Sequence, residues 1–479
     1  MLGDQTRTSP QDLAGLHRDK DTQKARYFMV WRWHFYAGLY VIPFMLMLSL
    51  TGLVMLFDQE IEHIRYQEVL VITPAQQSVP VSQQLHQVEA AYPLAQVTQY
   101  LPATSPEIAN KFSVKLASGQ SVFVTVNPYT GEVLGQINRS HSWYQWANQI
   151  HGTLLLGSWG DHFIEISASL TILLLVSGLF LWLPRDKASR AGFLRVRFAS
   201  GRRIMMRDLH ANLGGCLSLV MLFFVISGLA WTGVWGSQLV QAWNTFPTYY
   251  TWGEKPESVV THASLNTGSE EAIPWNLEQA AMPQSQAHVH GGAEQTSVTH
   301  PPYKANQQVG IDRIVGQAHQ LGFDRYTLYL PQSESGVYTL AANSMAGQVT
   351  DPRLDRTTHL DQYTGEAVLE VTWQDYTRLA QLMAAGVSLH QGDLSLLNKI
   401  ANTLFCLAFI TISLLGLLMW WIRRPSGKTR MGIPPRFAQD GLWKVGVGTL
   451  LVIALCFPLA AAALVVFGAV DWWVFRHKE

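Results

Sequence analysis

Five long runs of apolar residues constrain the fold of this chain most. Each run is close to the ~20 residues that a helix needs to cross the hydrocarbon core of a bilayer, or exceeds it. The runs are Phe35–Phe57, Phe163–Leu183, Leu213–Trp235, Ile400–Ile422 and Val445–Val470. Only 14% of the 479 residues are charged, and thirteen of the 17 Trp lie at or near the ends of the runs, as in the aromatic belts of membrane proteins. The sequence therefore predicts an α-helical integral membrane protein with about five transmembrane helices.

The distribution of Lys and Arg predicts the orientation. Six lie in residues 1–33, eight in 184–210, six in 423–444, four in 58–150 and seven in 236–389. Because positive charge accumulates on the cytoplasmic side, we expect a cytoplasmic N-terminus, two cytoplasmic loops and two long outer segments. The expected divisions are a cytoplasmic segment 1–33, spans 34–57, 151–183, 211–235, 390–422 and 445–470 (the second and fourth with an outer lead-in), outer segments 58–150 and 236–389, basic loops 184–210 and 423–444, and a tail 471–479.

The fifth run is the least regular of the five. Pro458 lies in its middle and is expected to kink it. A fifth crossing places the tail outside, although Arg476 and Lys478 argue against that side.

Each outer segment has the pattern of a small α/β domain. Helical spacing and strand-like alternation recur in the two segments, and each contains a Tyr-Thr-Gly-Glu turn. The expected helices are Val81–Tyr92 and Ile311–Leu321, and the expected strands are Phe112–Leu116, Ser121–Val126, Tyr326–Leu330 and Val337–Asn343, with a further short strand after residue 132. The second domain occupies 308–373. Residues 253–306 are polar and contain His288, His290 and His300, so we interpret them as a flexible linker rather than a metal-capturing segment.

The chain contains an internal duplication. His34-x3-Gly38 is followed by Thr51-Gly52-Leu53, and His210-x3-Gly214 by Ser227-Gly228-Leu229, with 18 residues from His to the second Gly in both copies. The returning spans match as well, because His151 and His390 each precede a Gly-Leu-rich span that ends in Trp. One unit of span, outer domain and span therefore occurs twice, and a fifth span is appended.

These motifs resemble the PepSY-associated transmembrane family of bacterial inner-membrane proteins, which includes iron-regulated membrane proteins and siderophore-iron reductases. The resemblance covers about residues 26–425. It rests on Arg32-Trp33-His34-x3-Gly38, the two Tyr-Thr-Gly-Glu turns, Ile150-His151-x2-Leu154-Leu155-Leu156-Gly157, Leu209-His210-x3-Gly214 and Leu389-His390-x-Gly392. It implies two periplasmic PepSY-like domains and a multi-pass protein of the bacterial inner membrane.

Four histidines are the candidate site residues. His34 and His210 lie at expected cytoplasmic ends of spans, and His151 and His390 near outer ends, so each repeat contributes one His at each depth. Neutral imidazoles on facing helices are common axial ligands of haem iron. The resemblance implies haem b, with two haems per chain, because the sequence has no Cys-x-x-Cys-His attachment motif. The alternative is that each His only anchors the headgroup region.

Other polar residues have weaker functional interpretations. His162, the acidic residues Asp58, Glu60 and Glu62, and the Arg run at 195–207 are each better explained by surface or topological roles. The seven histidines His17, His63, His86, His141, His319, His359 and His477 are expected to be solvated. Balanced charge, 34 Lys and Arg against 34 Asp and Glu, predicts no nucleic-acid binding. No nicotinamide-binding or Walker motif is present.

Two functions from different classes remain open. The first is an inner-membrane haem b electron-transfer protein that reduces periplasmic ferric complexes, such as a ferric siderophore, with electrons from quinol or a separate flavoprotein. The second is a non-enzymatic, membrane-anchored PepSY regulator or peptidase inhibitor, which needs no chromophore. A metal permease is less favoured because, His apart, no span carries a ladder of charged or amide side chains, and an assembly scaffold is the remaining alternative.

Overall fold

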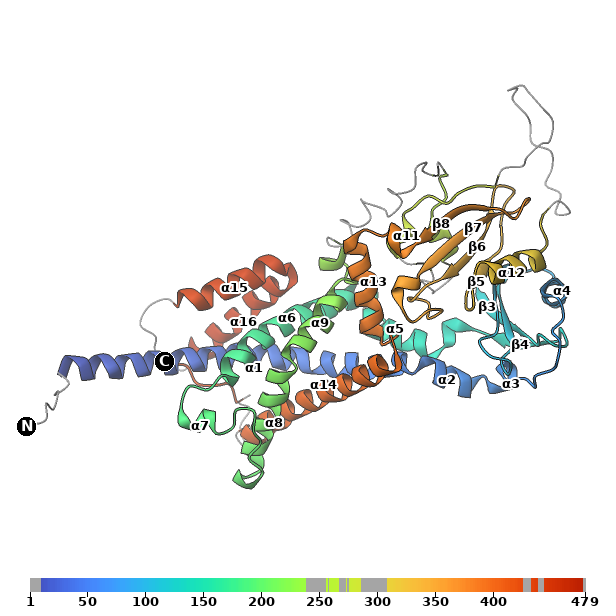
Figure 1. The fold of residues 1–479 in the computed structure, drawn as a ribbon. Coiled ribbons are helices and arrows are strands. Elements are labelled where there is room, and N and C mark those ends of the chain that lie inside the picture. The colour runs from blue at the N-terminus through green and yellow to red at the C-terminus, as the bar shows by residue number, and fades with distance from the viewer. Residues whose placement is uncertain are drawn as a thin grey trace, which may run out of the picture. The chain divides into compact units, whose positions relative to one another are not determined.

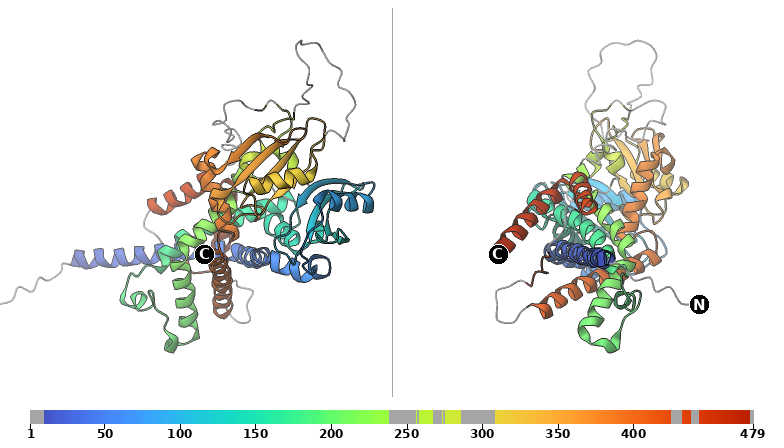
Figure 2. Two further views of the ribbon diagram at one scale, coloured as in Figure 1. Left: turned by 45° about the vertical axis from the view of Figure 1, so that its right-hand side comes forward. Right: turned by 90° about the vertical axis from the view of Figure 1, so that its left-hand side faces the viewer.

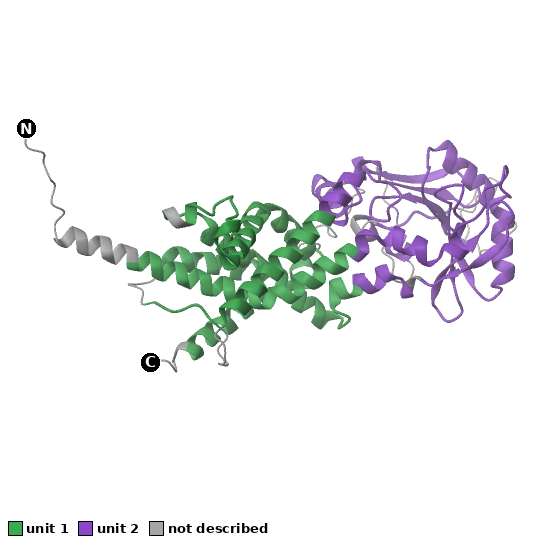
Figure 3. Ribbon diagram, turned by 90° about the horizontal axis from the view of Figure 1, so that it is seen from below, with its two compact units in different colours: residues 1–53, 149–240, 403–479 green, residues 54–148, 241–402 purple. Residues whose placement is uncertain are grey.

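The computed structural model describes residues 10–237, 256, 258–266, 273, 275–285, 308–424, 432–437 and 443–476. The chain divides into two compact units (Figure 3). The helical unit comprises Met1–Leu53, Gln149–Val240 and Thr403–Glu479, and the sheet unit comprises Val54–Asn148 and Gln241–Asn402.

The helical unit is built from helices of different lengths, which lie in it wholly or in part (Figure 1). They are α1 (Pro10–Leu56), α5 (Trp143–Thr153), α6 (Ser158–Trp182), α7 (Lys187–Arg190), α8 (Arg202–Cys216), α9 (Ser218–Leu229), α14 (Leu396–Arg423), α15 (Lys444–Cys456) and α16 (Pro458–Arg476). Figure 2 shows α1, in blue, as one continuous helix, although Pro43 lies inside it. Membrane helices tolerate such a proline because neighbouring groups satisfy the freed backbone carbonyl.

Three described helices are long and apolar enough to cross a membrane: Asp21–Leu56 within α1, and α6 and α14 in full. They contain the first, second and fourth predicted spans. The third predicted span is a pair of helices, α8 and α9, bent by 60°. Gly214 and Gly215 precede this bend, and the Trp182 ring fills the space that a Cβ at Gly215 would take. Sharp kinks are common at such small residues.

The prediction of five single transmembrane helices is therefore not confirmed. The described residues contain three spans, or four if the bent pair counts as one. The fifth predicted span is two shorter helices, α15 and α16, which pack against each other. The break lies at Phe457 because Pro458 has no N–H to continue the helix and its ring clashes with the preceding turn.

The sheet unit has one antiparallel sheet of eight strands in the order β4-β3-β2-β1-β5-β6-β7-β8. The strands are β1 (Gln96–Leu101), β2 (Asn110–Lys115), β3 (Ser121–Val126), β4 (Val133–Ile137), β5 (Thr327–Tyr329), β6 (Val337–Ala342), β7 (Arg356–Asp361) and β8 (Ala367–Thr372). The two predicted α/β domains are thus two halves of a single sheet. They join where β1 pairs with β5, with Gln99 opposite Tyr329 and Tyr100 opposite Leu328.

Helices and short 3-10 turns complete the sheet unit. They are α2 (Asp58–Arg65), α3 (Gln67–Leu70), α4 (Val81–Ala91), η1 (Arg139–His141), η4 (His262–Leu265), α11 (Trp275–Glu278), α12 (Ile311–Gln320), η6 (Pro352–Leu354), η7 (Trp373–Asp375) and α13 (Arg378–Gln391). The equivalent helices α4 and α12 lie side by side (Figure 1). The backbone N–H of Ser82 donates to Asp312 across them at 3.0 Å.

The predicted Tyr-Thr-Gly-Glu turns are confirmed and have the same geometry in both halves. Gly131 N–H donates to the carbonyl of Asn127, and Gly365 N–H to that of Asp361, both at 2.8 Å. The two glycines have φ of +77° and +75°, a left-handed conformation that only Gly adopts at little cost. The turns join β3 to β4 and β7 to β8, so the repeat seen in the sequence is a repeat of structure.

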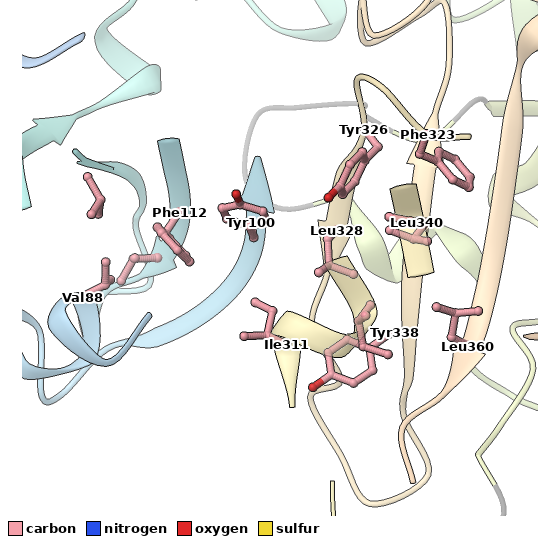
Figure 4. Packing of buried hydrophobic residues seen from close by; sticks show 14 of the residues in the cluster. Val88, Tyr100, Phe112, Ile311, Phe323, Tyr326, Leu328, Tyr338, Leu340 and Leu360 are labelled. Carbon is pink, nitrogen blue, oxygen red and sulfur yellow. The ribbon is translucent and has the colours of Figure 1, made fainter. Parts of the chain in front are cut away.

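One face of the sheet packs against α4 and α12 in a single core that both halves share (Figure 4). Phe112 and Leu340 are fully buried there, one from each half. The halves bury their apolar side chains together, which explains why they form one sheet rather than two separate domains.

The other face of the second half is covered by residues that we predicted to be a flexible linker. Ile273, Leu277 and Ala280 are completely buried and pack with Tyr329 and Val371 of the sheet. The linker interpretation of 253–306 is therefore wrong for the described residues between 258 and 285. The apolar residues of this segment are too few and too irregularly spaced for the sequence to identify it as part of the core. His288, His290 and His300 lie outside the described residues.

Candidate functional site

His34 on α1 and His210 on α8, far apart in the sequence, are neighbours in the helical unit. Their ring centroids are 6.3 Å apart, and the ring planes are perpendicular at 90°. The predicted pairing of one histidine from each repeat at this end of the spans therefore corresponds to direct proximity in the structure.

Hydrogen bonds assign the proton on each of these rings. Nδ1 of His210 lies 2.9 Å from the carbonyl oxygen of Ile412. A carbonyl can only accept, so Nδ1 carries the hydrogen and Nε2 keeps its lone pair. Nδ1 of His34 lies 3.0 Å from Ser177 Oγ. Since the Ser177 hydroxyl donates its own proton to the Leu173 carbonyl at 2.6 Å, it accepts from His34, and Nε2 of that ring also keeps its lone pair.

Each of the two rings rests against a glycine of a returning span. A Cβ built on Gly178 of α6 would lie 3.1 Å from Cε1 of His34, and one on Gly416 of α14 would lie 3.4 Å from Cε1 of His210. These glycines occupy matching places in the repeated Ser-Gly-Leu and Leu-Gly-Leu segments. The sequence alone directs attention instead to Gly38 and Gly214, whose added Cβ atoms would approach no histidine.

His151 on α5 is hydrogen-bonded to a hydroxyl of α1, as His34 is to Ser177. Its Nδ1 lies 2.9 Å from Thr51 Oγ1, and Thr51 donates to the Met47 carbonyl at 2.8 Å. Nδ1 of His151 therefore also carries the hydrogen, and a Cβ on Gly52 would lie 3.9 Å from its Cε1. Three of the four predicted histidines thus present an Nε2 lone pair.

The chain turns sharply after His151. Leu154 and Leu155 have φ of +53° and +61°, a left-handed conformation that is rare for residues with a branched side chain. The pair lies within the motif that carries His151, and strained backbone of this kind concentrates at functional sites.

His390 lies near the end of α13 and belongs to the sheet unit. Its carbonyl accepts from Asn402 Nδ2 at 2.9 Å, and Asn402 also donates to the Leu389 carbonyl at the same distance. The asparagine fixes the end of α13 that carries His390. The predicted pairing of His390 with His151 stays a prediction.

The lesser candidates are held by structural contacts. His162 packs edge-on to Trp159 with ring centroids 6.2 Å apart. Its acidic neighbour Glu165 is buried and accepts from the backbone N–H groups of Val234 and Trp235 at 3.0 and 3.1 Å. Glu60 pairs with Lys399 at 2.6 Å. These contacts favour a role in folding rather than an outer cation site.

Two arginines of the Arg run also form ion pairs close to their own loop. Arg197 and Arg207 both pair with Asp208 at 2.8 Å, and Asp208 is buried. Asp208 lies inside α8, two residues before His210, so its pairing with Arg197 joins the preceding loop to the part of α8 that carries His210.

The structure reveals a histidine pair in the sheet unit that the sequence does not predict. Nε2 of His262 and Nε2 of His359 lie 2.9 Å apart, and both residues are completely buried. The prediction that His359 is solvated is wrong, because the segment around His262 covers it. Burial lowers the pKa of His262 to about 4 and holds the pKa of His359 well below its ordinary value.

Hydrogen bonds assign both rings of this second pair as neutral. His262 Nδ1 donates to the Ala280 carbonyl at 2.7 Å, so its Nε2 accepts from His359. His359 Nδ1 then accepts from the Thr339 hydroxyl at 2.9 Å. Every ring nitrogen is satisfied, which identifies the pair as a structural clamp between the covering segment and β7.

Among the described residues, no group of three or more His, Cys, Asp or Glu side chains gathers as a metal site. Haem iron needs only one or two axial ligands from the protein, so paired histidines are the relevant arrangement for that cofactor.

Comparison with known proteins yields one finding. The model of the PepSY-associated TM region matches residues 31–423. No curated protein matches the chain significantly. The match begins one residue before Arg32-Trp33-His34, ends with α14, and includes all four candidate histidines. With three apolar helices of membrane-spanning length and a match over most of its residues, the chain belongs to the PepSY-associated transmembrane family.

Proposed function

We propose that this protein is an inner-membrane electron-transfer protein with two b-type haems, which reduces ferric complexes on the periplasmic side. The observation that carries the proposal is the arrangement of His34 and His210. They are two neutral imidazoles from different repeats, with adjacent rings and with Nε2 lone pairs available.

The separation of the two rings is close to the spacing that two imidazoles on one iron ion would have. A metal–imidazole bond is about 2 Å long. Adding the distance from a ring nitrogen to its ring centre gives about 6 Å between the centres of two imidazoles on opposite sides of one metal. The observed separation is 6.3 Å. Ser177 and the Ile412 carbonyl supply the Nδ1 hydrogen bonds that commonly orient metal-bound histidines.

His151 and His390 are the proposed ligands at the outer end of the spans. Thr51 orients His151 as Ser177 orients His34. Asn402 fixes the helix end that bears His390. Haem at each pair supplies a one-electron carrier, and the protein contributes ligands, orientation and an apolar surrounding that tunes the potential.

The direction of transfer follows from the distribution of positive charge. The N-terminus and basic loops are placed in the cytoplasm by the positive-inside rule. Electrons would come from quinol or a separate flavoprotein, and each ferric ion takes one. Reduction favours iron release because Fe(II) binds hard oxygen donors less tightly than Fe(III).

A visible absorption spectrum of the purified protein, with and without dithionite, tests the cofactor. We expect a haem band that shifts on reduction and returns when ferric citrate or a ferric trihydroxamate is added. A colourless protein, purified from cells supplied with haem precursor, contradicts the proposal and supports a PepSY regulator that only anchors its outer halves. Bound haem that no ferric complex reoxidises faster than buffer contradicts only the acceptor.

A further inference from the structure

The two ends of the C-terminal helical hairpin, α15 and α16, meet one turn of α1. Trp443, which precedes α15, stacks on Trp33 with ring centroids 6.2 Å apart and planes 17° apart. Near the end of α16, Asp471 Oδ1 lies 3.2 Å from Arg32 Nε and accepts from the Tyr36 hydroxyl at 2.8 Å. The hairpin therefore begins and ends at the same level of α1.

The arms of the hairpin are too short to cross a bilayer and return. From Lys444 to Cys456, and from Pro458 to Asp471, each arm rises about 20 Å at 1.5 Å per residue. The hydrocarbon core is about 30 Å thick. The turn at Phe457 ends against Trp235, with ring centroids 5.9 Å apart. It also lies in the apolar cluster around Leu170 and Leu173 of α6.

We propose that α15 and α16 form a re-entrant hairpin, which enters the membrane beside Arg32 and leaves it on the same side. The C-terminus then lies on the side where α1 begins, and the crossings are α1, α6, the bent pair α8–α9, and α14. This replaces the expectation that a fifth crossing places the tail outside. It also accounts for Arg476 and Lys478, which the positive-inside rule assigns to the side of the basic loops.

Asp471 is the residue that fixes the hairpin. Arg32 is only 7% exposed, and a buried guanidinium needs a carboxylate partner and further hydrogen-bond acceptors. Asp471 is that carboxylate, and the Pro435 carbonyl accepts from Arg32 at 3.0 Å. The hairpin and the connection before it are thus held by one side chain of α1.

The contact between Arg32 and Asp471, which we call the anchor, lies on α1, the helix that carries His34. It is on the face of α1 opposite to His34. Arg32 and Tyr36 are four residues apart and share one face of α1, which they present to Asp471. His34 lies between them in sequence and points to the other face, where it meets Ser177. The hairpin therefore supports α1 from behind at the level of the His34–His210 pair.

Side-specific cysteine labelling tests the topology without reference to any cofactor. In a chain with Cys216, Cys406 and Cys456 replaced by Ala, single cysteines are introduced as Lys444→Cys and Arg476→Cys, with Ser140→Cys in the first outer segment as the reference. A membrane-impermeant maleimide is applied to right-side-out and inverted vesicles. We expect the first two positions to label from one side and Ser140→Cys from the other. Labelling of Arg476→Cys from the side opposite to Lys444→Cys overturns the proposal.

A double-mutant cycle tests the anchor. Arg32→Gln and Asp471→Asn are made singly and together, and the thermal midpoint of the detergent-solubilised protein is measured. Because each single change leaves the other charge without its partner, we expect the double variant to lose no more than the worse single variant. Additive losses show that the two residues do not interact and overturn the anchor. The labelling side of Arg476→Cys is read in each variant that still folds.

Discussion

Ser177 Oγ accepts the Nδ1 hydrogen of His34 at 3.0 Å while donating its own proton to the backbone of α6. The hydroxyl cannot turn around without losing its bond to the Leu173 carbonyl. It therefore fixes both the tautomer and the orientation of the His34 ring, and the protein relies on a neighbouring helix, not on α1 itself, to present Nε2.

Replacing Ser177 by Ala removes this acceptor and leaves the histidine in place. Loss of a hydrogen bond that orients a metal-bound histidine typically costs about 10–100-fold in affinity, so we expect haem bound at the His34–His210 pair to dissociate roughly 10-fold faster. Haem transfer to an excess of apomyoglobin measures the rate. Thr171→Val on the same helix removes a hydroxyl that donates to the Ser167 carbonyl within its own helix, and it is the matched control. An equal effect of the two variants contradicts the assignment.

A side chain at Gly178 is expected to push the His34 ring out of its position. A Cβ there would lie 3.1 Å from His34 Cε1, so Gly178→Ala displaces the ring at a cost of about 1–3 kcal/mol for overpacking. We expect less haem per chain and an altered spectrum. Gly448→Ala in α15 is the control, since its Cβ meets nothing within 4 Å and an Ala in a helix is favoured over Gly. Normal haem content in Gly178→Ala would show that the ring position is unimportant.

The four histidines are expected to act as two separate pairs. His34→Ala or His210→Ala should each remove half of the bound haem, and His151→Ala or His390→Ala the other half, because each change removes one proposed axial ligand. His162→Ala should change nothing. The pyridine haemochrome assay measures haem per chain. Full haem content in all four variants would return these residues to an anchoring role in the headgroup region.

The fold could be predicted best where a local feature of the sequence determines the local structure. The first, second and fourth spans follow from apolar length, and the Gly131 and Gly365 turns follow from the conformational needs of glycine. The fifth span is not confirmed, because apolar length alone cannot distinguish a single crossing from a hairpin of two shorter helices. Only the contacts of Asp471 and Trp443 with α1 reveal that both ends lie at one level.

The sheet was predictable in its halves but not as a whole. The pairing of β1 with β5 is a long-range contact that no local pattern encodes. Strand β6 is buried along its full length, because the segment with Leu277 covers the face that alternation would leave exposed to water. In the site, duplication predicted the meeting of His34 with His210, whereas Ser177 and the His262–His359 pair carry no sequence signal that separates them from other polar residues.

Leu277 is expected to behave as a core residue although it lies in a polar stretch. Its side chain is fully buried, so Leu277→Ala should cost about 2–5 kcal/mol. Val259 in the same segment is 97% exposed, and Val259→Ala should change stability by less than about 0.5 kcal/mol. Pulse proteolysis across a urea series measures both. Equal midpoints for the two variants would restore the flexible-linker interpretation.

The His262–His359 clamp is expected to make the sheet unit less stable in acid. In the folded protein the pKa of His262 is lowered to about 4, whereas an unfolded histidine titrates near about 6.5. Between these values the unfolded chain binds more protons, so the clamp's contribution is complete above about pH 6.5 and is lost as the pH falls towards 4. Because the pKa of His359 is lowered as well, both histidines contribute to this loss in the same direction.

The pH dependence of stability that Asp355 contributes is opposite in sign to that of the two histidines. Asp355 must therefore be replaced before the effect of the histidines is measured. Burial raises its pKa to about 7, so its contribution grows as the pH falls and masks the loss from the histidines. In an Asp355→Asn background we expect amides of residues 258–285 to exchange with deuterium faster at pH 5 than at pH 7, after correction for the intrinsic exchange rate. The added change His359→Gln should abolish this difference, while His319→Gln, which alters an exposed histidine of α12, should preserve it. A pH response that survives His359→Gln would place the sensing group elsewhere in the sheet unit.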